Sequence, residues 1–351
     1  MDEASHRRTE VSVDRRESIK RVLQGERSER LPRALFGGGR WAYHQMGLTA
    51  AKLADDPDGF AEILAGLYAE LDTDIVFAGS GLNTFPAEAI GGDLAFREEQ
   101  APLLAAPLIQ KTDDARYLEA VNIEDSPHAL ALVEMVARLR ALLPDRFLCA
   151  TSWGPFTWAM ILCDWVLLQE KTLTDREFIR EVTELGVRLS SAFFHPLIER
   201  GLIDGIVIAD GAATLIPLDL YRDVVLPCER KLFEQARERG VARFFHQCGD
   251  IRAQVGLYPD AGADCISLDT GVRLGEVEKL YRGHVVLAGN VDVIKTVFGG
   301  DATMICQAVS ECVHGIADPF RKFILMPSCD LPLETSLTNV KTFLACADRI
   351  V

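Results

Sequence analysis

Three residues of this chain have the types and spacing to hold a catalytic metal ion. His246 and Cys248 lie two positions apart in the run FFHQCG (244–249), and Cys329 lies far along the chain in PSCD (327–330). Each group directly follows a short apolar run typical of a β-strand. One imidazole and two thiolates form a ligand set for zinc that leaves a fourth position open, as catalytic zinc sites do.

The charges of these ligands indicate which chemistry the metal would support. Two thiolates and one neutral imidazole cancel the 2+ charge of zinc, so the bound ion is a soft and weak Lewis acid. It would lower the pKa of a bound thiol and leave the thiolate nucleophilic. The set therefore favours alkyl transfer to or from sulfur over hydrolysis.

The alternative interpretation is that these cysteines are small hydrophobic residues of the core, as free cysteines commonly are. The remaining cysteines lie in apolar or helical settings and are expected to be core or surface thiols. They are Cys149, Cys163, Cys228, Cys265, Cys306, Cys312 and Cys346.

Composition and charge exclude several classes of protein. The chain has 351 residues, of which 48% are hydrophobic and 25% charged, as in ordinary globular proteins. Its net charge of −15 argues against nonspecific binding to nucleic acid or to an anionic membrane. No signal peptide or apolar run long enough to span a bilayer is found, and 9 irregularly spaced cysteines do not suggest a secreted disulfide framework. A reducing cytoplasm is the expected location.

Short apolar runs, most of them ending at Gly, Asp, Asn or Pro, alternate with amphipathic stretches of helical period. The predicted strands are 33–36, 73–78, 146–151, 204–209, 242–246, 264–268, 284–288 and 322–327. The predicted helices are 15–24, 58–70, 129–143, 176–201, 218–239, 250–260, 302–316 and 335–349. Pro196 lies inside one of these helices and is expected to kink or split it.

Apolar strands that alternate with helices predict a parallel sheet covered by helices. Eight such strands at this length favour an α/β fold with a single (β/α)8 TIM barrel. The barrel domain would span 15–351, behind a flexible N-terminal extension at 1–14. The segment 79–145 must then hold irregular structure or extra elements. A doubly wound open sheet is the alternative.

Active sites of such barrels lie at the C-terminal ends of the strands. We therefore expect His246, at the end of the fifth strand, to lie on the same face as Cys248 and Cys329. Side chains two apart in an extended segment point to the same side, which suits the first two of these ligands.

Three polar residues end other predicted strands and are candidates for the same face. Asp210 would orient the substrate or act as an acid or base, or alternatively cap the segment 211–217. Asp269 and Asn290 would line the pocket, although Asn290 could equally cap a helix.

Further candidates lie in the loops. Gly38 and Gly39, in a glycine triplet after the first strand, would allow the backbone to approach a ligand closely, or simply make a flexible loop. Trp153 could stack on an aromatic substrate or a corrin ring, or pack in the core. Asp330 and Glu334 are candidates for the open zinc position or for supporting its ligands.

The chain resembles the uroporphyrinogen decarboxylase superfamily, and within it the cobalamin-linked methyltransferases, over about 15–350. Residues 16–32, a helix leading into RLP, are similar to the superfamily's opening. The other matching runs are GPFT (154–157), IADGAA (208–213), FHQCGD (245–250), GAD (262–264), ISLD (266–269), LAGNVD (287–292) and CDLP (329–332), followed by Thr335 and Asn339.

This resemblance implies one of two chemistries. Decarboxylases of the superfamily use a cluster of N-terminal arginines, an aspartate and a tyrosine, without metal. The corresponding run here is FGGGRWAYH (36–44), which keeps Arg40 as a candidate catalytic residue and Tyr43 as a candidate substrate contact but lacks a paired-arginine motif. An acidic chain with few fixed cations would hold a polycarboxylate poorly.

The methyltransferase branch carries a His-x-Cys pair and a distant Cys as zinc ligands, and this chain has all three. The resemblance therefore implies a zinc methyltransferase that moves methyl between a corrinoid (methylcobalamin) and a thiol or a methoxylated or methylated small molecule. A separate corrinoid protein is the expected partner, since the cobalt-ligating Asp-x-His-x-x-Gly motif is absent from the sequence. The alternatives are a metal-free decarboxylase and a noncatalytic corrinoid- or porphyrin-binding protein. The oligomeric state does not follow from the sequence.

Overall fold

The computed structural model of the chain describes residues 14–97, 100–117 and 121–350. The flexible extension predicted at 1–14 lies outside the described residues except for Asp14. Its carboxylate accepts a hydrogen bond from the Glu17 backbone N–H at 3.0 Å and so caps the first helix, α1 (Arg15–Leu23). The helix therefore begins where the sequence predicted it.

Seven parallel strands form one curled sheet, and neighbours in the sheet follow one another along the chain. In order they are β1 (Ile75–Ala78), β4 (Phe147–Trp153), β5 (Gly205–Ala209), β6 (Ala242–Gln247), β7 (Cys265–Leu268), β8 (Val286–Val291) and β9 (Phe323–Pro327).

The first predicted strand, 33–36, joins the two edges of this sheet. Arg33 forms a parallel bridge with Leu325 of β9, and Ala34 forms one with Ile75 of β1. The barrel is thus completed by a pair of bridges instead of a full strand. The predicted (β/α)8 barrel is confirmed, and the doubly wound open sheet is wrong.

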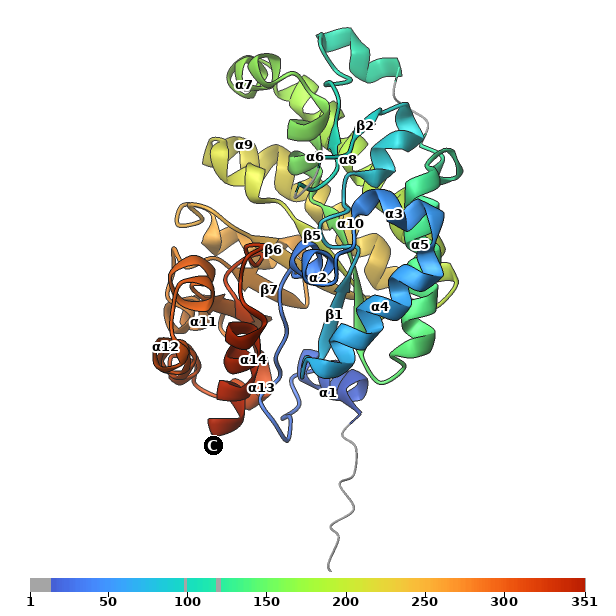
Figure 1. The fold of residues 1–351 in the computed structure, drawn as a ribbon. Helices are drawn as coiled ribbons and strands as arrows, with labels where there is room; N and C mark the ends of the chain where they lie inside the picture. Colours follow the sequence, from blue (N-terminus) through green and yellow to red (C-terminus); the bar gives the residue numbers. More distant parts are fainter. Residues whose placement is uncertain (1–13, 98–99, 118–120, 351) are drawn as a thin grey trace, which may run out of the picture.

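The inside of the barrel is filled by side chains that alternate along the strands. This buried cluster includes Ile75, Phe147, Val207, Phe244, Cys265, Val286 and Ile324. Ile19 and Val22 of α1 belong to it, so α1 packs against the N-terminal end of the barrel, where Figure 1 shows it. Functional side chains must therefore come from the opposite, C-terminal end of the strands.

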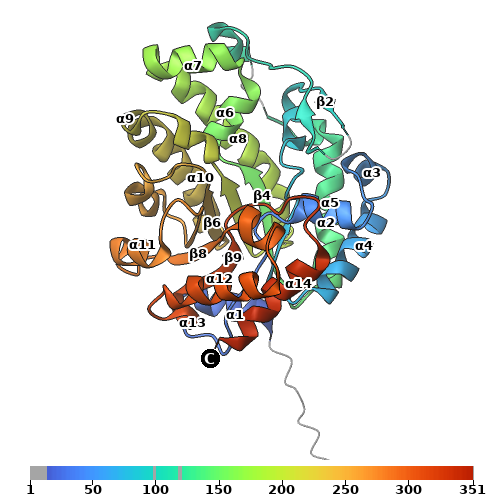
Figure 2. The ribbon, with the colours of Figure 1, turned by 60° about the vertical axis from the view of Figure 1, so that its left-hand side comes forward.

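Helices cover the outside of the sheet, as Figures 1 and 2 show. The long predicted helices are confirmed. They are α4 (Pro57–Glu70), α5 (Pro127–Leu142), α8 (Arg176–Glu199), α10 (Leu226–Glu238), α12 (Ala302–His314) and α14 (Leu337–Cys346). The α9 (Leu218–Leu220) and π-helical η5 (Tyr221–Val225) turns lead directly into α10, and η8 (Ala347–Arg349) follows α14.

Two local predictions differ from the structure. Pro196 does not split its helix, because α8 continues past it to Glu199. The helix predicted at 250–260 is a 3-10 helix, η6 (Val255–Ala261), which contains Pro259. Proline has no N–H for the α-helical ladder, which suits the shorter and tighter element.

Several short helices in the connections between longer elements were not predicted, because few turns give little periodicity. They are α2 (Gly39–Gln45), α3 (Ala50–Asp55), α6 (Pro155–Leu162), α7 (Trp165–Thr174), α11 (Leu274–Tyr281), α13 (Pro319–Lys322), η4 (Gly211–Leu215) and η7 (Val293–Phe298). The segment 79–145 holds extra elements, as expected. They are η1 (Phe85–Ile90), a hairpin of β2 (Leu94–Ala95) and β3 (Leu103–Leu104), η2 (Thr112–Tyr117), η3 (Ile123–Asp125) and α5.

The expectation that Cys306 and Cys346 are free thiols is wrong. They form a disulfide with a Cα–Cα distance of 5.2 Å, which joins α12 to the end of α14. The two helices pack side by side, and this brings together cysteines that are 40 positions apart. Within the described residues, no helix has the length and apolar character needed to cross a membrane.

Candidate metal centre

The strand alternation of β6 directs His246 into the barrel. Phe244 belongs to the inner cluster. Phe245 faces outward, with its ring 5.7 Å from that of Phe233 on α10. His246, two positions after Phe244, therefore points inward and is only 1% exposed. Cys248 follows on the same side, directly beyond the end of the strand.

Two neighbours fix the ring of His246. Its Nδ1 lies 3.0 Å from Ser267 Oγ, at the equivalent inward position of β7. The ring of Phe36 stacks on the imidazole with centroids 3.8 Å apart and an interplanar angle of 21°. With Nδ1–H donated to the serine hydroxyl, Nε2 keeps its lone pair for a metal.

The third ligand comes from the opposite side of the barrel. Cys329 follows β9, and its Sγ lies 3.7 Å from His246 Nε2. The ligand atoms of His246, Cys248 and Cys329 all lie within 4.8 Å of one another. Tetrahedral zinc with its usual bond lengths would separate a nitrogen and a sulfur ligand by about 3.6 Å. The donor types and their spacing therefore fit zinc.

The two thiols act on each other's ionisation. The neighbouring Cys329 thiol lowers the pKa of Cys248, and the neighbouring Cys248, together with burial, raises the pKa of Cys329. A cation placed between the sulfurs would favour the thiolate form of both. Gly211 leaves room for the pair, because a Cβ at that position would lie 2.5 Å from Cys248 Sγ.

Neither acid proposed for the fourth position is a ligand in this geometry. Among the described residues, the group of possible ligands that lie close together contains only the histidine and the two cysteines. Asp330 packs on Gly37, where a Cβ would fall 1.1 Å from its Oδ1. Desolvation by the surrounding atoms raises the pKa of Asp330, while His246 and Arg40 act to lower it. Glu334 is exposed.

Asp210 lies at the end of β5, as predicted, but its carboxylate caps α6 and not the segment 211–217. It accepts hydrogen bonds from the Phe156 N–H at 3.1 Å, the Thr157 N–H at 2.6 Å and the Thr157 hydroxyl at 2.8 Å. Burial raises the pKa of Asp210 to about 6. These contacts hold the carboxylate at the start of α6, so the structure does not favour the acid/base role.

Asp269 and Asn290 shape the loops around the ligands. Asp269 Oδ2 accepts the N–H of Gly249, the residue after Cys248, at 3.0 Å. Asn290 Nδ2 donates to the carbonyl oxygens of Asp269 and Val272, both at 3.0 Å. Both residues thus support the loop beside the metal ligands. The side-chain amide of Asn290 is used in these bonds and does not cap a helix.

The N-terminal candidates lie on α2 and at its start. Gly38 has a φ of +56° and begins the helix, and Gly39 packs so closely that a Cβ would lie 2.0 Å from Ser80 O. Tyr43 is buried, and its ring packs edge-on against Phe60 at 5.1 Å. The positions of Gly38, Gly39 and Tyr43 are therefore explained by the packing of α2 against α4 and against the loop after β1.

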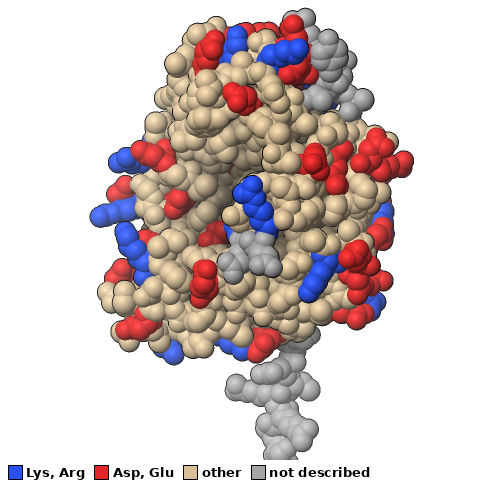
Figure 3. Space-filling view, turned by 45° about the horizontal axis from the view of Figure 1, so that its top comes forward, with Lys and Arg blue, Asp and Glu red and all other residues tan. Residues whose placement is uncertain are grey.

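Arg40 and Tyr43 border a pocket of about 470 Å³ formed by the loops after the bridging segment 33–34, β1 and β9. Trp153 is half-buried and donates from Nε1 to Thr84 Oγ1 at 3.2 Å. Figure 3 shows that the face carrying these loops is hollowed, with mostly uncharged residues around the hollow and Lys or Arg at its edge. None of the residues that line the pocket of about 470 Å³ is one of the three candidate metal ligands.

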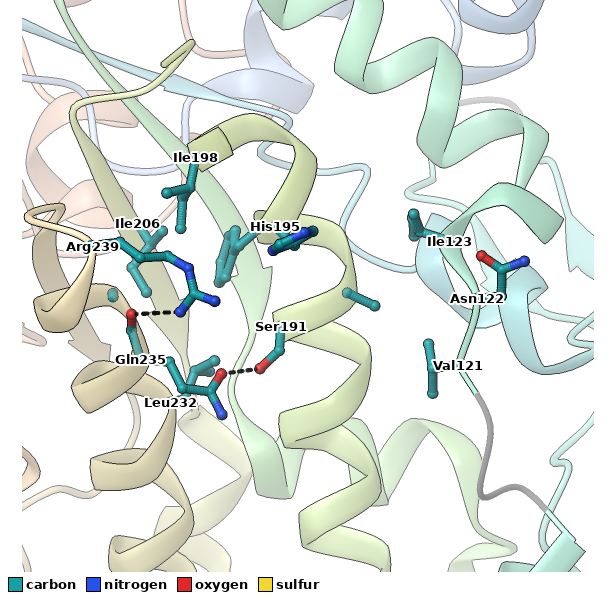
Figure 4. A pocket seen from close by; sticks show the side chains of 13 residues that line it. Val121, Asn122, Ile123, Ser191, His195, Ile198, Ile206, Leu232, Gln235 and Arg239 are labelled. Atoms are coloured by element: carbon teal, nitrogen blue, oxygen red, sulfur yellow. Dashed lines mark hydrogen bonds between the residues drawn. The ribbon is translucent and has the colours of Figure 1, made fainter. Parts of the chain in front are cut away.

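A second pocket, of about 360 Å³, lies between α8 and α10 on the outer layer (Figure 4). Ser191 donates to Gln235 Oε1 at 2.6 Å across it, and Arg239 donates to the Gln235 carbonyl at 3.1 Å. None of its lining residues belongs to the candidate metal centre.

Sequence reasoning missed Ser267, Phe36 and Glu229. Ser267 could have been found, since it lies two residues after an inward cysteine on the strand next to β6. Phe36 directly precedes the glycine triplet but carries no chemical signal of its own. Glu229 is completely buried on α10, where helical periodicity alone does not distinguish it from a surface acid.

Comparison with known proteins shows the relationship of the chain. The model of the family described as uroporphyrinogen decarboxylase (URO-D) matches residues 14–350. A uroporphyrinogen decarboxylase of Streptomyces griseus is 29% identical over 59% of this chain, and one of Thermobifida fusca is 30% identical over 59%. The matches span 57% of the length of each of these relatives.

Similarity to a methyltransferase covers more of the chain. A methylated-thiol–coenzyme M methyltransferase of Methanosarcina mazei is 25% identical over 75% of this chain and 69% of its own length. Among solved structures, a methyltransferase from the same organism covers 95% of this chain and 98% of its own, with a TM-score of 0.78 and 20% identity. A putative vitamin-B12-independent methionine synthase of Listeria monocytogenes superposes with a TM-score of 0.57 and 13% identity, covering 92% of this chain and 97% of its own. These structures share the fold.

Proposed function

Because this chain belongs to the uroporphyrinogen decarboxylase (URO-D) family, whose relatives include decarboxylases and a methyltransferase, we propose that it is a methyltransferase of the zinc-dependent kind. The reaction would move a methyl group between a corrinoid and a thiol or a methylated or methoxylated small molecule. The observation that carries the proposal is the convergence of His246, Cys248 and Cys329 within 4.8 Å at the C-terminal mouth of the barrel.

His246 Nε2 and the two cysteine sulfurs would hold the metal. Zinc bound by two thiolates and an imidazole supplies charge stabilisation for a substrate thiolate without making it inert. The protein's own contribution is to fix the ligands: Ser267 holds Nδ1 and Phe36 covers one face of the ring. The open fourth position would then face the substrate.

The hollowed face would receive the partners. The small molecule would enter beside Arg40 and Tyr43, which border the pocket of about 470 Å³. The corrinoid would be presented by a separate protein at the same mouth. The similarity to the methylated-thiol–coenzyme M methyltransferase of M. mazei supports methyl transfer that involves sulfur.

A metal-free decarboxylase is the second candidate, and the names of several relatives favour it. Arg40 and Arg97 border the same pocket and could contact substrate carboxylates. This alternative assigns no role to the two cysteines that converge on His246. It predicts carbon dioxide release that is insensitive to chelators.

The test is methyl transfer from methylcobalamin to a panel of small thiols, measured with wild type, Cys329→Ser and Cys163→Ser. Cys163 is also buried but lies away from the ligands, so its variant controls for the loss of a cysteine. We expect Cys329→Ser to lose transfer and Cys163→Ser to keep it. Full activity in Cys329→Ser would refute the proposal. Carbon dioxide release from a tetrapyrrole acid by both variants would favour the decarboxylase.

A further inference from the structure

Two buried carboxylic acids lie directly behind the candidate metal centre. Asp210 at the end of β5 and Glu229 on α10 are both 0% exposed. Two acids near each other in a dry interior disfavour each other's ionisation, and the charge of Asp210 acts to raise the pKa of Glu229.

The two acids have different hydrogen-bond partners. The Asp210 oxygens accept three hydrogen bonds at the N-terminus of α6, a place that favours an anion. Glu229 accepts a hydrogen bond from the Tyr221 hydroxyl at 2.8 Å. Burial and the neighbouring Asp210 raise the pKa of Glu229 well above its usual range.

Glu229 also reaches the residue between two metal ligands. Strand alternation turns Gln247 away from the barrel interior, and its Nε2 lies 3.5 Å from Glu229 Oε1. Gln247 is 0% exposed, and its Oε1 has no hydrogen-bond partner among the described residues. Its side chain is therefore held by the hydrogen bond to Glu229. In the backbone, the Asp210 N–H donates to the His246 carbonyl at 3.2 Å.

We propose that Glu229 is a positioning residue for the metal centre: its carboxyl group, anchored by the Tyr221 hydroxyl, holds Gln247 and so sets where β6 places His246 and Cys248. The inference rests on the proposed zinc site. It assigns a role to a buried acid that the methyl-transfer proposal does not use, and it makes the outer helix α10 part of the support of the ligands.

The test compares two replacements of Glu229 in zinc affinity and in the absorption spectrum of the cobalt(II)-substituted protein. Glu229→Gln keeps the shape and an oxygen that can accept a hydrogen bond from Gln247, so affinity within about threefold of wild type and an unchanged spectrum are expected. Glu229→Leu removes the link. Loss of groups that support metal ligands typically weakens binding about 10–100-fold, and we expect at least the lower figure with a shifted spectrum.

Leu232→Ala is the matched control, since Leu232 is buried on the same helix and its side chain has no polar atom that could bond to Gln247. It should lower the melting temperature and leave the cobalt spectrum unchanged. If Glu229→Leu does not fold, Gln247→Leu breaks the same contact from the other side. The inference would be overturned if a folded Glu229→Leu or Gln247→Leu variant kept the zinc affinity and the cobalt spectrum of the wild type. It would also be overturned if Leu232→Ala changed the spectrum equally. Failure of the wild type itself to bind zinc would overturn the proposed function instead.

Discussion

Cys329 Sγ lies 3.7 Å from His246 Nε2, although 83 positions separate the two residues in the chain. The closed barrel explains this contact, because β6 and β9 deliver their C-terminal ends to one mouth. Cys248 completes the group from the loop directly after β6, the strand that carries the histidine. The ligand geometry is therefore a consequence of strand order and strand alternation, and it can be tested residue by residue.

Replacing Ser267 with alanine should weaken zinc binding. The serine hydroxyl lies 3.0 Å from His246 Nδ1, and loss of such a partner typically costs about 10–100-fold in metal affinity. Zinc affinity measured by competition with a chelator checks this. Ser328→Ala is the control, because Ser328 is buried next to Cys329 but accepts its hydrogen bond from the Val293 N–H. Equal affinities in both variants would contradict the assigned role of Ser267.

Adding a methyl group at Gly211 should displace a metal ligand. A Cβ there would lie 2.5 Å from Cys248 Sγ, so Gly211→Ala must move the sulfur or the backbone. We expect reduced zinc content and a loss of about 1–3 kcal/mol in the free energy of unfolding. Gly256→Ala is the control, since the nearest atom to its Cβ would be 4.0 Å away. Normal zinc binding by Gly211→Ala would show that the ligand loop is more adaptable than the packing implies.

Asp210 should make the folded state less stable as the pH rises from about 4 to about 6. Burial raises its pKa from 3.8 to about 6, so the folded state holds a proton in this range that the unfolded state has released. The contribution of this proton to stability is full below the pKa that Asp210 has in the unfolded state. It is lost as the pH rises through the pKa that Asp210 has in the folded state. Relative to Asp210→Asn, the wild type should lose about 2–3 kcal/mol of unfolding free energy across this interval. Urea unfolding at several pH values measures the difference, and a pH-independent difference would contradict the prediction.

Reducing the disulfide between Cys306 and Cys346 should destabilise the protein. Closing a loop with a sequence separation of 40 residues corresponds to about 2–4 kcal/mol. The melting temperature should fall on addition of a thiol reductant and in Cys306→Ser. Zinc content is expected to stay constant, because the bond joins α12 and α14 on the outer layer. An unchanged melting temperature under reducing conditions would show that the two cysteines do not form a stabilising bond.

Much of the architecture followed from periodicity. The eight apolar runs predicted as strands are the seven strands of the sheet and the bridging segment 33–34. The expectation that His246, Cys248 and Cys329 meet also followed, because strand-end position alone places them at one mouth. Short helices such as α2 and α6 could not be predicted from so few turns.

What the sequence could not provide are relationships between side chains of different elements. Asp210 was correctly placed at a strand end, but its partner is α6, which was not predicted. The acid pair of Asp210 and Glu229 depends on how α10 packs on the sheet. The disulfide depends likewise on the packing of α12 against α14, which a separation of 40 positions does not reveal.

The most direct test of the proposed metal centre is zinc content per chain, determined by elemental analysis on wild type, Cys329→Ser and Cys163→Ser purified side by side. The account predicts close to one zinc per chain in wild type and in Cys163→Ser, and much less in Cys329→Ser. No zinc in folded wild type after reconstitution, or full zinc in Cys329→Ser, would contradict it.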